Sequence, residues 1–238
     1  MMNKIIAISG IRNTGKTTTG DMLRFMLSTP KFLHHYWIYK RFPKLTLKGN
    51  WLNVSFAGSL KEMLAVLLRV PVEMFENRDF KENVFVDFND LTFHRRENLK
   101  KYQILSDSKF SRKVKEMSID VRANLLSIRQ LLQYWGTEIC RTYLGENIWT
   151  VATIKNADTH NLIISDVRFK NEADFIRKNN GVIVYIDRPG CLVGAHKSEQ
   201  ECFELYQNGQ VDYVIHNDGS LKDLFNKIKK LRTQLLEF

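Results

Sequence analysis

KIIAISGIRNTGKTT, residues 4–18, is the stretch that decides the fold of this chain. Its first part, residues 4–8, is a short apolar run rich in β-branched side chains, which predicts a buried strand. Its second part, residues 10–17, matches the pattern G-x-x-x-x-G-K-[ST] in every fixed position. A helical pattern then runs from residue 16 to about residue 27. Because a strand precedes the motif and a helix follows it, we interpret the match as a phosphate-binding loop rather than a chance occurrence.

The chemistry of this loop predicts binding of a nucleoside triphosphate with Mg²⁺. Glycines at both ends let the loop wrap so that its backbone N–H groups point inward at a phosphate, and the following helix adds its positive N-terminal end. Lys16 would reach the β- and γ-phosphates, and the Thr17 hydroxyl would be a ligand of Mg²⁺. We therefore expect ATP contacts from the loop and the helix start, at Gly10, Asn13, Thr14, Gly15, Lys16, Thr17 and Thr18.

A second apolar run in the sequence ends in an acid. Residues 161–165, NLIIS, predict a strand, and Asp166 follows them directly. A carboxylate in this place accompanies Mg²⁺ in P-loop enzymes, although many strands end in Asp simply because it caps a turn or helix. We predict Thr17 and Asp166 as the Mg²⁺ ligands. Arg168 would add a cation at the same edge of the sheet, where ligands bind in open α/β folds.

Four polar residues recur at intervals of four in a strongly helical stretch, residues 125–144: Arg129, Gln133, Thr137 and Arg141. On a helix these residues share one face, away from an apolar stripe of Ile128, Leu132, Trp135 and Ile139. Two arginines beside an amide and a hydroxyl suit a phosphate and a base; the alternative is an ordinary solvated face. Gly136 disfavours an ordinary helix here and suggests that a ligand approaches the backbone closely.

Strand and helix patterns alternate along the rest of the chain. The expected strands are residues 4–8, 51–56, 161–165, 182–186 and 213–215, with helices between them. This alternation predicts an α/β fold, a parallel β-sheet flanked by helices as in P-loop NTPases. We expect a single domain over residues 1–238, with helical or irregular insertions at about 29–50 and 73–120 forming the acceptor and lid regions.

The amino-acid composition limits the classes of molecule that this chain is expected to bind. Its 238 residues are 44% hydrophobic and 26% charged, which is ordinary for a globular protein. The net charge of +10 and the pI of about 9.5 favour anionic partners, either nucleic acid or small phosphates. No apolar stretch approaches the roughly 20 residues that span a bilayer. Three cysteines without a CxxC pair indicate reduced thiols, as in a cytoplasmic protein.

Further motifs follow the loop in a fixed order. They are FAGSLK at residues 56–61, RQLLQxxGTE at 129–138, Trp149, DVRFxNE at 166–172, RPG at 188–190, HxSE at 196–199 and NDGS at 217–220. Together with the loop, this series resembles the deoxynucleoside monophosphate kinases of tailed bacteriophages. The resemblance covers most of the chain except residues 29–50 and roughly 73–120. The loop is common to many families, whereas RxLLQxxGTE combined with DVRFxNE is much more specific.

The resemblance implies an activity and a set of residues. The γ-phosphoryl group of ATP would pass directly to a deoxynucleoside monophosphate, with Mg²⁺, in the cytoplasm of the host. By this resemblance, the catalytic residues would be Lys16, Arg129, Asp166 and Arg168. The residues that bind the acceptor nucleotide would be Lys61, Arg129, Gln133, Thr137, Arg141, Arg168 and Glu172. Arg188 is the candidate lid cation, and Asn217, Asp218 and Gly219 would lie near the adenine of ATP. The partners would be small-molecule nucleotides, without nucleic acid or membrane, and a homodimer is compatible with the family.

Several alternatives stay open at this point. The enzyme could be another small-molecule kinase with the same loop, such as one resembling dephospho-coenzyme A kinase. It could also be a nucleic-acid-binding ATPase, because residues 31–50 mix aromatic and basic side chains and contain no acid. Residues 196–199 could simply begin a helix, with Ser198-x-x-Glu201 as a capping box, and Ser220-x-x-Asp223 resembles another cap. Glu172 is either an acid at a helix start or a residue that orients Arg168.

Overall fold

The computed structural model describes residues 4–47, 50–97, 125–157 and 159–236. The chain divides into two compact units, which are described separately below. The sheet unit comprises residues 1–56 and 149–238, and the inserted unit comprises residues 57–148. Of the two insertions expected from the sequence, residues 29–50 belong to the sheet unit. Residues 73–97 belong to the inserted unit, and residues 98–120 lie outside the described residues. The assignment of one domain to the whole chain stays a prediction.

The sheet unit is built on a five-stranded sheet in the order β2-β6-β1-β7-β8. Every neighbouring pair is parallel, which confirms the predicted α/β sheet. The central strand is the apolar run before the loop, and it is buried along its whole length because strands flank it on both sides. The strands are β1 (Ile5–Ser9), β2 (Trp51–Val54), β6 (Asn161–Val167), β7 (Val182–Asp187) and β8 (Tyr213–His216).

Strand β6 is longer than the sequence indicates. We expected it to end at Ser165, but it continues through Asp166 to Val167. Its pairing with β1 shifts on the way, since Ala7 lies opposite Ile164 whereas Ser9 lies opposite Val167. One extra residue therefore bulges from β6 beside the end of β1. Bulges of this kind redirect side chains next to active sites, and here the extra residue falls beside Asp166.

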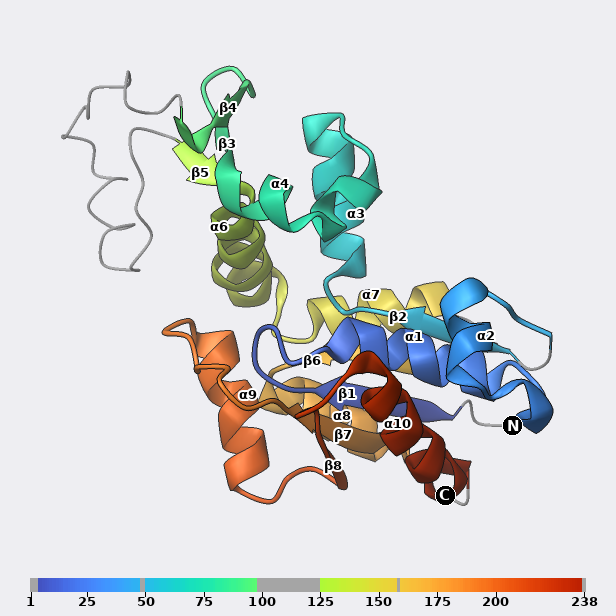
Figure 1. The fold of residues 1–238 in the computed structure, drawn as a ribbon. Coiled ribbons are helices and arrows are strands. Elements are labelled where there is room, and N and C mark those ends of the chain that lie inside the picture. Colours follow the sequence, from blue (N-terminus) through green and yellow to red (C-terminus); the bar gives the residue numbers. More distant parts are fainter. Residues whose placement is uncertain (1–3, 48–49, 98–124, 158, 237–238) are drawn as a thin grey trace. The chain divides into compact units, whose positions relative to one another are not determined.

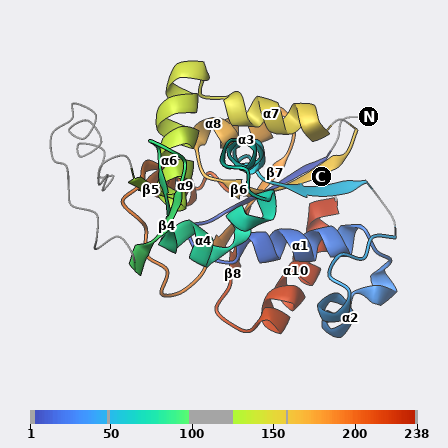
Figure 2. The ribbon, with the colours of Figure 1, turned by 90° about the horizontal axis from the view of Figure 1, so that it is seen from above.

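Helices cover both faces of the sheet. Figures 1 and 2 show α1 and α10 side by side on one face and α8 on the other. The core between β1, β7, α1 and α10 includes Ile6, Ile8, Phe25 and Ile228, all fully buried. The helical elements are α1 (Lys16–Leu27), η1 (Lys31–Leu33), α2 (Tyr36–Arg41), α7 (Ile148–Ala157), α8 (Lys170–Lys178), α9 (Lys197–Gln207) and α10 (Leu221–Leu236). None of the helices within the described residues is long and apolar enough to cross a membrane.

Two expected helix caps have different outcomes. At α10 the Ser220 hydroxyl accepts from the backbone N–H of Asp223, whose carboxylate accepts from the N–H of Ser220. This reciprocal pair confirms the predicted cap. At α9 the prediction that residues 196–199 begin a helix is confirmed, but the capping box between Ser198 and Glu201 is wrong. The capping residue is His196, whose ring nitrogen accepts from the N–H of Ser198.

The inserted unit contains short helices and a three-stranded antiparallel sheet in the order β4-β3-β5. Its elements are α3 (Gly58–Leu68), η2 (Val72–Glu76), α4 (Arg78–Asn83), β3 (Val84–Asp87), β4 (Phe93–Arg95), β5 (Leu125–Ser127), α6 (Ile128–Gln133) and the π-helical segment Tyr134–Leu144. The single helix expected over residues 125–144 is therefore wrong in two respects. Its first three residues pair with β3 as a strand, and α6 begins only after the capping residue Ser127. Its second half has π-helical hydrogen bonding.

Candidate functional site

The phosphate-binding loop lies between β1 and α1, as the motif predicts, and its glycines are required by its geometry. Gly10 has φ +144°, and a Cβ at this residue would lie 2.6 Å from the carbonyl oxygen of Ile186. Gly15 has φ +100° and precedes the first residue of α1. Both backbones are in the region that disfavours side chains. The Thr14 hydroxyl closes the loop by donating to the carbonyl of Ile11 at 2.9 Å.

Lys16 is the buried charge at the centre of the loop. Only 8% of the residue is exposed, and its ammonium donates to the carbonyl oxygen of Ile11 at 2.6 Å. Burial, followed by the charge of Arg168, lowers the pKa of Lys16 to about 8, although Glu199 and Asp166 act in the opposite direction. The lysine therefore lies among two carboxylates and a second cation. A cation desolvated in this way interacts strongly with any phosphate that enters the loop.

Asn217 supports the loop from the carboxyl end of β8. Its side-chain amide donates to the carbonyl of Thr14 at 2.8 Å, and Asn217 is itself buried. The next residue, Asp218, is exposed and forms an ion pair with Lys227 of α10. Asn217 therefore has a structural partner within the loop. The expectation that residues 217–219 lie near an adenine stays a prediction.

Asp166 and Thr17 supply oxygen donors of the kind that Mg²⁺ takes. The Asp166 carboxylate accepts from the backbone N–H of Phe56 at 2.7 Å, which orients it beside the loop. Thr17 is exposed in the first turn of α1. Among the described residues, no group of three or more His, Cys, Asp or Glu side chains could hold a metal ion. Mg²⁺ does not need such a group, because it keeps several waters and uses one or two carboxylates together with substrate phosphates.

Glu199 connects the loop to Arg168, and the sequence analysis did not assign it a role. One of its carboxylate oxygens accepts from the backbone N–H of Arg12 at 2.7 Å, and the other pairs with the guanidinium of Arg168. Only 8% of the Glu199 side chain is exposed, against 31% for Arg168. The carboxylate thus holds a loop N–H and the neighbouring cation in fixed relation. The HxSE motif contained the signal, which we interpreted only as a helix start.

Two other residues predicted near Arg168 differ in their surroundings. Glu172 is buried and accepts from the backbone N–H groups of Arg168 and Phe169 at the start of α8. It therefore acts as the acid of a helix start, and it orients the backbone of Arg168. Arg188 is exposed in the turn that follows β7. Its role as a lid cation stays a prediction.

The inserted unit brings together cations and carboxylates from four elements, α3, η2, α4 and α6. Arg129 of α6 donates to Glu82 at 2.8 Å, and Lys61 of α3 donates to Glu76 at 2.6 Å. Lys81 of α4 lies among them. Burial lowers its pKa, and Lys61 and Arg129 lower it as well, while both glutamates raise it. The cluster contains three cations and two carboxylates, so its net charge suits an anion. Sequence patterns missed Lys81 because the segment around it has no clear periodicity.

The other predicted acceptor residues follow α6 along the π-helical segment. The five-residue hydrogen-bonding step changes which residues face inward, so the expected stripe of Ile128, Leu132, Trp135 and Ile139 is only partly correct. The buried residues are Ile128, Leu131, Gly136, Cys140 and Arg141. Gln133 and Thr137 are partly exposed, whereas buried Arg141 donates to the carbonyl of Glu146 at 3.0 Å.

Gly136 has a packing explanation. A Cβ at this position would lie 2.8 Å from a methyl carbon of Leu60, which comes from α3. The glycine therefore lets two helical segments of the inserted unit approach each other. Our expectation that Gly136 admits a ligand to the backbone is replaced by this contact, because the space beside the glycine is filled by a leucine.

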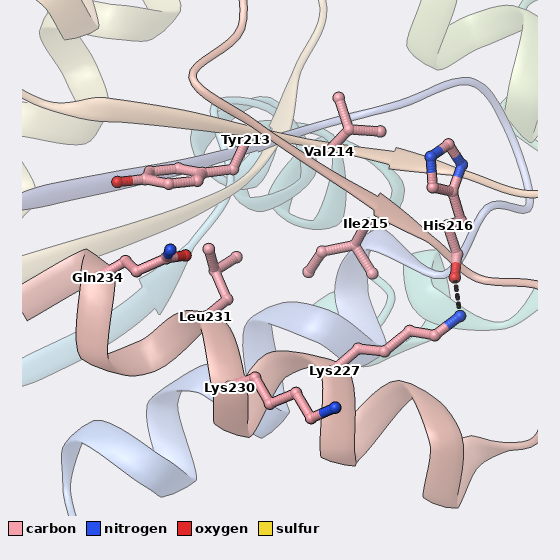
Figure 3. A pocket seen from close by; sticks show the side chains of 8 residues that line it. All are labelled: Tyr213, Val214, Ile215, His216, Lys227, Lys230, Leu231 and Gln234. Atoms are coloured by element: carbon pink, nitrogen blue, oxygen red, sulfur yellow. Dashed lines mark hydrogen bonds between the residues drawn. The ribbon is translucent and has the colours of Figure 1, made fainter.

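An open groove of about 440 Å³ lies in the sheet unit between β8 and α10. Figure 3 shows side chains of both elements around it, with Lys227 donating to the carbonyl of His216 at 2.6 Å. The groove is lined by Tyr213, Val214, Ile215, His216, Lys227, Lys230, Leu231 and Gln234. It contains none of the predicted site residues, so volume alone does not indicate the site here.

Comparisons with known proteins identify a family that this chain matches. The family model described as deoxynucleotide monophosphate kinase matches residues 69–228, more than half of the chain. A protein of Acanthamoeba polyphaga mimivirus, provisionally named a deoxynucleotide monophosphate kinase, is 36% identical over 42% of this chain and 58% of its own length. The deoxynucleoside-5'-monophosphate kinase of Escherichia phage T5 is 29% identical over 48% of this chain and 46% of its own length. The matches thus span about half the length of these two relatives. The deoxynucleotide monophosphate kinase of Enterobacteria phage T4 is 23% identical over 95% of this chain and 97% of its own length.

Proposed function

This chain belongs to the deoxynucleotide monophosphate kinase family, and on that premise we propose that it transfers the γ-phosphoryl group of ATP to a deoxynucleoside monophosphate. The observation that carries the proposal is the buried Lys16 in a complete phosphate-binding loop, with Asp166, Arg168 and Glu199 around it. The products would be ADP and a deoxynucleoside diphosphate. The acceptor phosphate is already an oxyanion, so the protein needs to supply alignment and positive charge but no nucleophile of its own.

The sheet unit supplies the groups for ATP. The backbone N–H groups of the loop and the Lys16 ammonium would bind the β- and γ-phosphates. Arg168 would neutralise negative charge on the phosphoryl group during its transfer. Thr17 and Asp166 would hold Mg²⁺, which would supply positive charge to the phosphates. Glu199 keeps Arg168 and the loop N–H of Arg12 in place. It acts through them and is a positioning residue.

The inserted unit supplies the groups for the acceptor. Arg129, Lys61 and Lys81 form the cationic cluster that would bind the acceptor phosphate. Their carboxylate partners Glu76 and Glu82 hold the side chains ready in defined positions. Gln133 and Thr137 would contact the sugar or base, as their amide and hydroxyl groups allow.

A panel of acceptors tests the proposal. ADP release with Mg-ATP would be measured for each deoxynucleoside monophosphate, each ribonucleoside monophosphate and dephospho-coenzyme A. We expect release with at least one deoxynucleoside monophosphate, no turnover in Lys16→Ala, and a larger rise in KM for the acceptor than for ATP in Arg129→Ala. Lys155→Ala, an exposed change on α7, is the matched control and should retain activity. No release with any deoxynucleoside monophosphate, or full activity in Lys16→Ala, would contradict the proposal.

A further inference from the structure

The segment from η1 through α2 presents aromatic and basic side chains together on the surface of the sheet unit. Phe32, Trp37 and Phe42 are 73%, 68% and 51% exposed, which is unusual for side chains of this size. Lys31, Lys40 and Arg41, which lie within three residues of these rings in the sequence, are exposed as well. We call these six residues the basic aromatic surface. The guanidinium of Arg41 lies 5.8 Å from the centre of the Phe42 ring, so a cation and a ring share one part of this surface.

The packing of this segment explains why these rings face solvent. Tyr36 and Tyr39 turn inward, with ring centres 5.8 and 5.6 Å from that of Phe225 on α10. Tyr39 also meets Phe25 of α1 at 5.5 Å, and burial raises the pKa of its phenol to about 12. Ile38 is buried as well. Since these side chains already hold the segment on the core, the exposed rings are not needed for its attachment.

The charge of this surface has one sign. Residues 31–50 contain no acid, and in the described part of the chain Lys31, Lys40 and Arg41 form no ion pair with a carboxylate. The positive charge continues onto α10, which packs beside α2 in both ribbon views (Figures 1 and 2). There Lys229 donates to the carbonyl of His34 at 2.8 Å, so its ammonium adjoins the segment that leads into α2. An anionic partner therefore meets cations from two elements.

We propose that the basic aromatic surface binds single-stranded nucleic acid. Its backbone would lie along the cations, and unpaired bases would stack on the three exposed rings. A second copy of this chain is a poor partner, because a symmetric interface would bring like charges together. An anionic membrane is also a poorer partner, because α2 has only six residues and only Trp37 of the three exposed rings lies on it, so it has no continuous apolar face.

This surface is independent of the phosphate-binding loop. No residue of the loop and none of the proposed acceptor residues belongs to it, so the inference stands or fails apart from the kinase activity. From the sequence we predicted small-molecule nucleotides as partners and no nucleic acid, and kept a nucleic-acid-binding ATPase only as an alternative. The structure adds what the sequence could not supply, namely which aromatic side chains of this segment are buried and which are exposed.

The test measures binding of labelled oligothymidylate and oligouridylate by fluorescence anisotropy over a range of salt concentrations. We expect binding that weakens with salt by about 0.7 in log affinity per log salt for each cation engaged. The double variant Lys40→Gln/Arg41→Gln should therefore reduce that slope by about 1.4. Replacing Phe32, Trp37 or Phe42 by alanine should weaken binding by roughly fivefold to a hundredfold, because each stacked base is lost. Lys155→Gln/Lys178→Gln removes two exposed charges elsewhere and should change neither quantity.

Tryptophan fluorescence provides a second readout. Trp37 is 68% exposed, whereas Trp51 and Trp149 are each 8% exposed and Trp135 is only partly exposed, so stacking should quench chiefly Trp37. Quenching by oligothymidylate should disappear in Trp37→Phe while binding persists. Absence of binding at low salt, unchanged affinity in the alanine variants, or tighter binding to anionic phospholipid vesicles than to either oligonucleotide would overturn the proposal. Kinase activity of all these variants should match the unmodified protein.

Discussion

Replacing Glu199 by glutamine tests the role that the structure assigns to this carboxylate. The side chain keeps its size, but it loses its charge and one of its two acceptor oxygens. The remaining oxygen can still accept from the backbone N–H of Arg12, at 2.7 Å in the unmodified protein. The new amide group then points donors at the guanidinium of Arg168, so Arg168 has to move away.

The size of the effect follows from burial and charge. A hydrogen bond to a charged group contributes about 1.5–3 kcal/mol. The Glu199 side chain is 8% exposed and that of Arg168 is 31% exposed, so water can solvate part of the Arg168 guanidinium and replace some of the lost interaction. We expect a loss of about 2 kcal/mol in the free energy of unfolding, or a decrease in Tm of about 4–8 °C. A displaced Arg168 should reduce kcat by about a hundredfold, as a shift of about 1 Å in a positioning group can do.

Lys16 provides a readout that a merely structural role for Glu199 would not change. Glu199 raises the pKa of Lys16, against the larger effects of burial and Arg168 that bring it to about 8. Removing the negative charge alone would lower the pKa of Lys16, but displacement of Arg168 also removes the larger lowering effect, so the pKa of Lys16 should rise. Because phosphate binding needs the protonated lysine, kcat/KM for ATP should begin to fall at a higher pH in Glu199→Gln than in the unmodified enzyme.

The assay combines thermal unfolding with pH profiles of kcat and of kcat/KM for each substrate. Glu204→Gln, an exposed change on the same helix, is the matched control and should alter none of them. If Glu199→Gln lowered Tm while kcat and the pH profile stayed unchanged, the residue would be structural only. Our reasoning about Arg168 and Lys16 would then be refuted.

Three further predictions concern charge and packing. Lys16→Met should abolish turnover yet raise the free energy of unfolding at pH 7 by about 2 kcal/mol. The depressed lysine pKa represents a burial cost of about 3 kcal/mol, which the lost bond to Ile11 partly offsets. The free energy of unfolding of the unmodified protein should rise between about pH 8 and 10.5, because over this range Lys16 is already deprotonated in the folded protein but still protonated in the unfolded chain. Lys16→Met should lack this rise when urea unfolding is measured as a function of pH. Lys81→Gln should raise KM for the acceptor at least fivefold with KM for ATP unchanged in steady-state kinetics; equal changes in both would count against the cationic cluster. Gly136→Ala should cost about 1 kcal/mol in urea unfolding because its Cβ meets Leu60, and the cost should vanish in a Leu60→Ala background.

Local sequence determined the centre of the sheet unit. The β-branched run at residues 5–8 can be satisfied only by burial between strands, and the glycines at 10 and 15 are needed for a loop with positive φ. Strand, loop and helix are contiguous there, so each is specified by its own residues. The alternation of later strands and helices was sufficient to predict the parallel sheet for the same reason.

The inserted unit was harder to predict because its order depends on contacts between distant segments. Leu125–Ser127 continues a helical pattern, yet pairing with β3 makes it a strand. Gly136 looked like a place for a ligand, but Leu60, seventy-six residues earlier, fills the space. In both places a partner far along the chain overrides the local preference.

The candidate site likewise contains some residues that the local sequence identifies and others whose roles depend on tertiary contacts. The sequence alone determined Gly10, Gly15, Lys16 and Thr17, since a phosphate-binding loop is a local structure whose groups act within a few residues of one another. Only the tertiary structure decided that Glu199 joins the loop to Arg168 and that Lys81 lies with Arg129. Charges interact through space, so their roles depend on which segments the fold brings together and on how far it removes them from water.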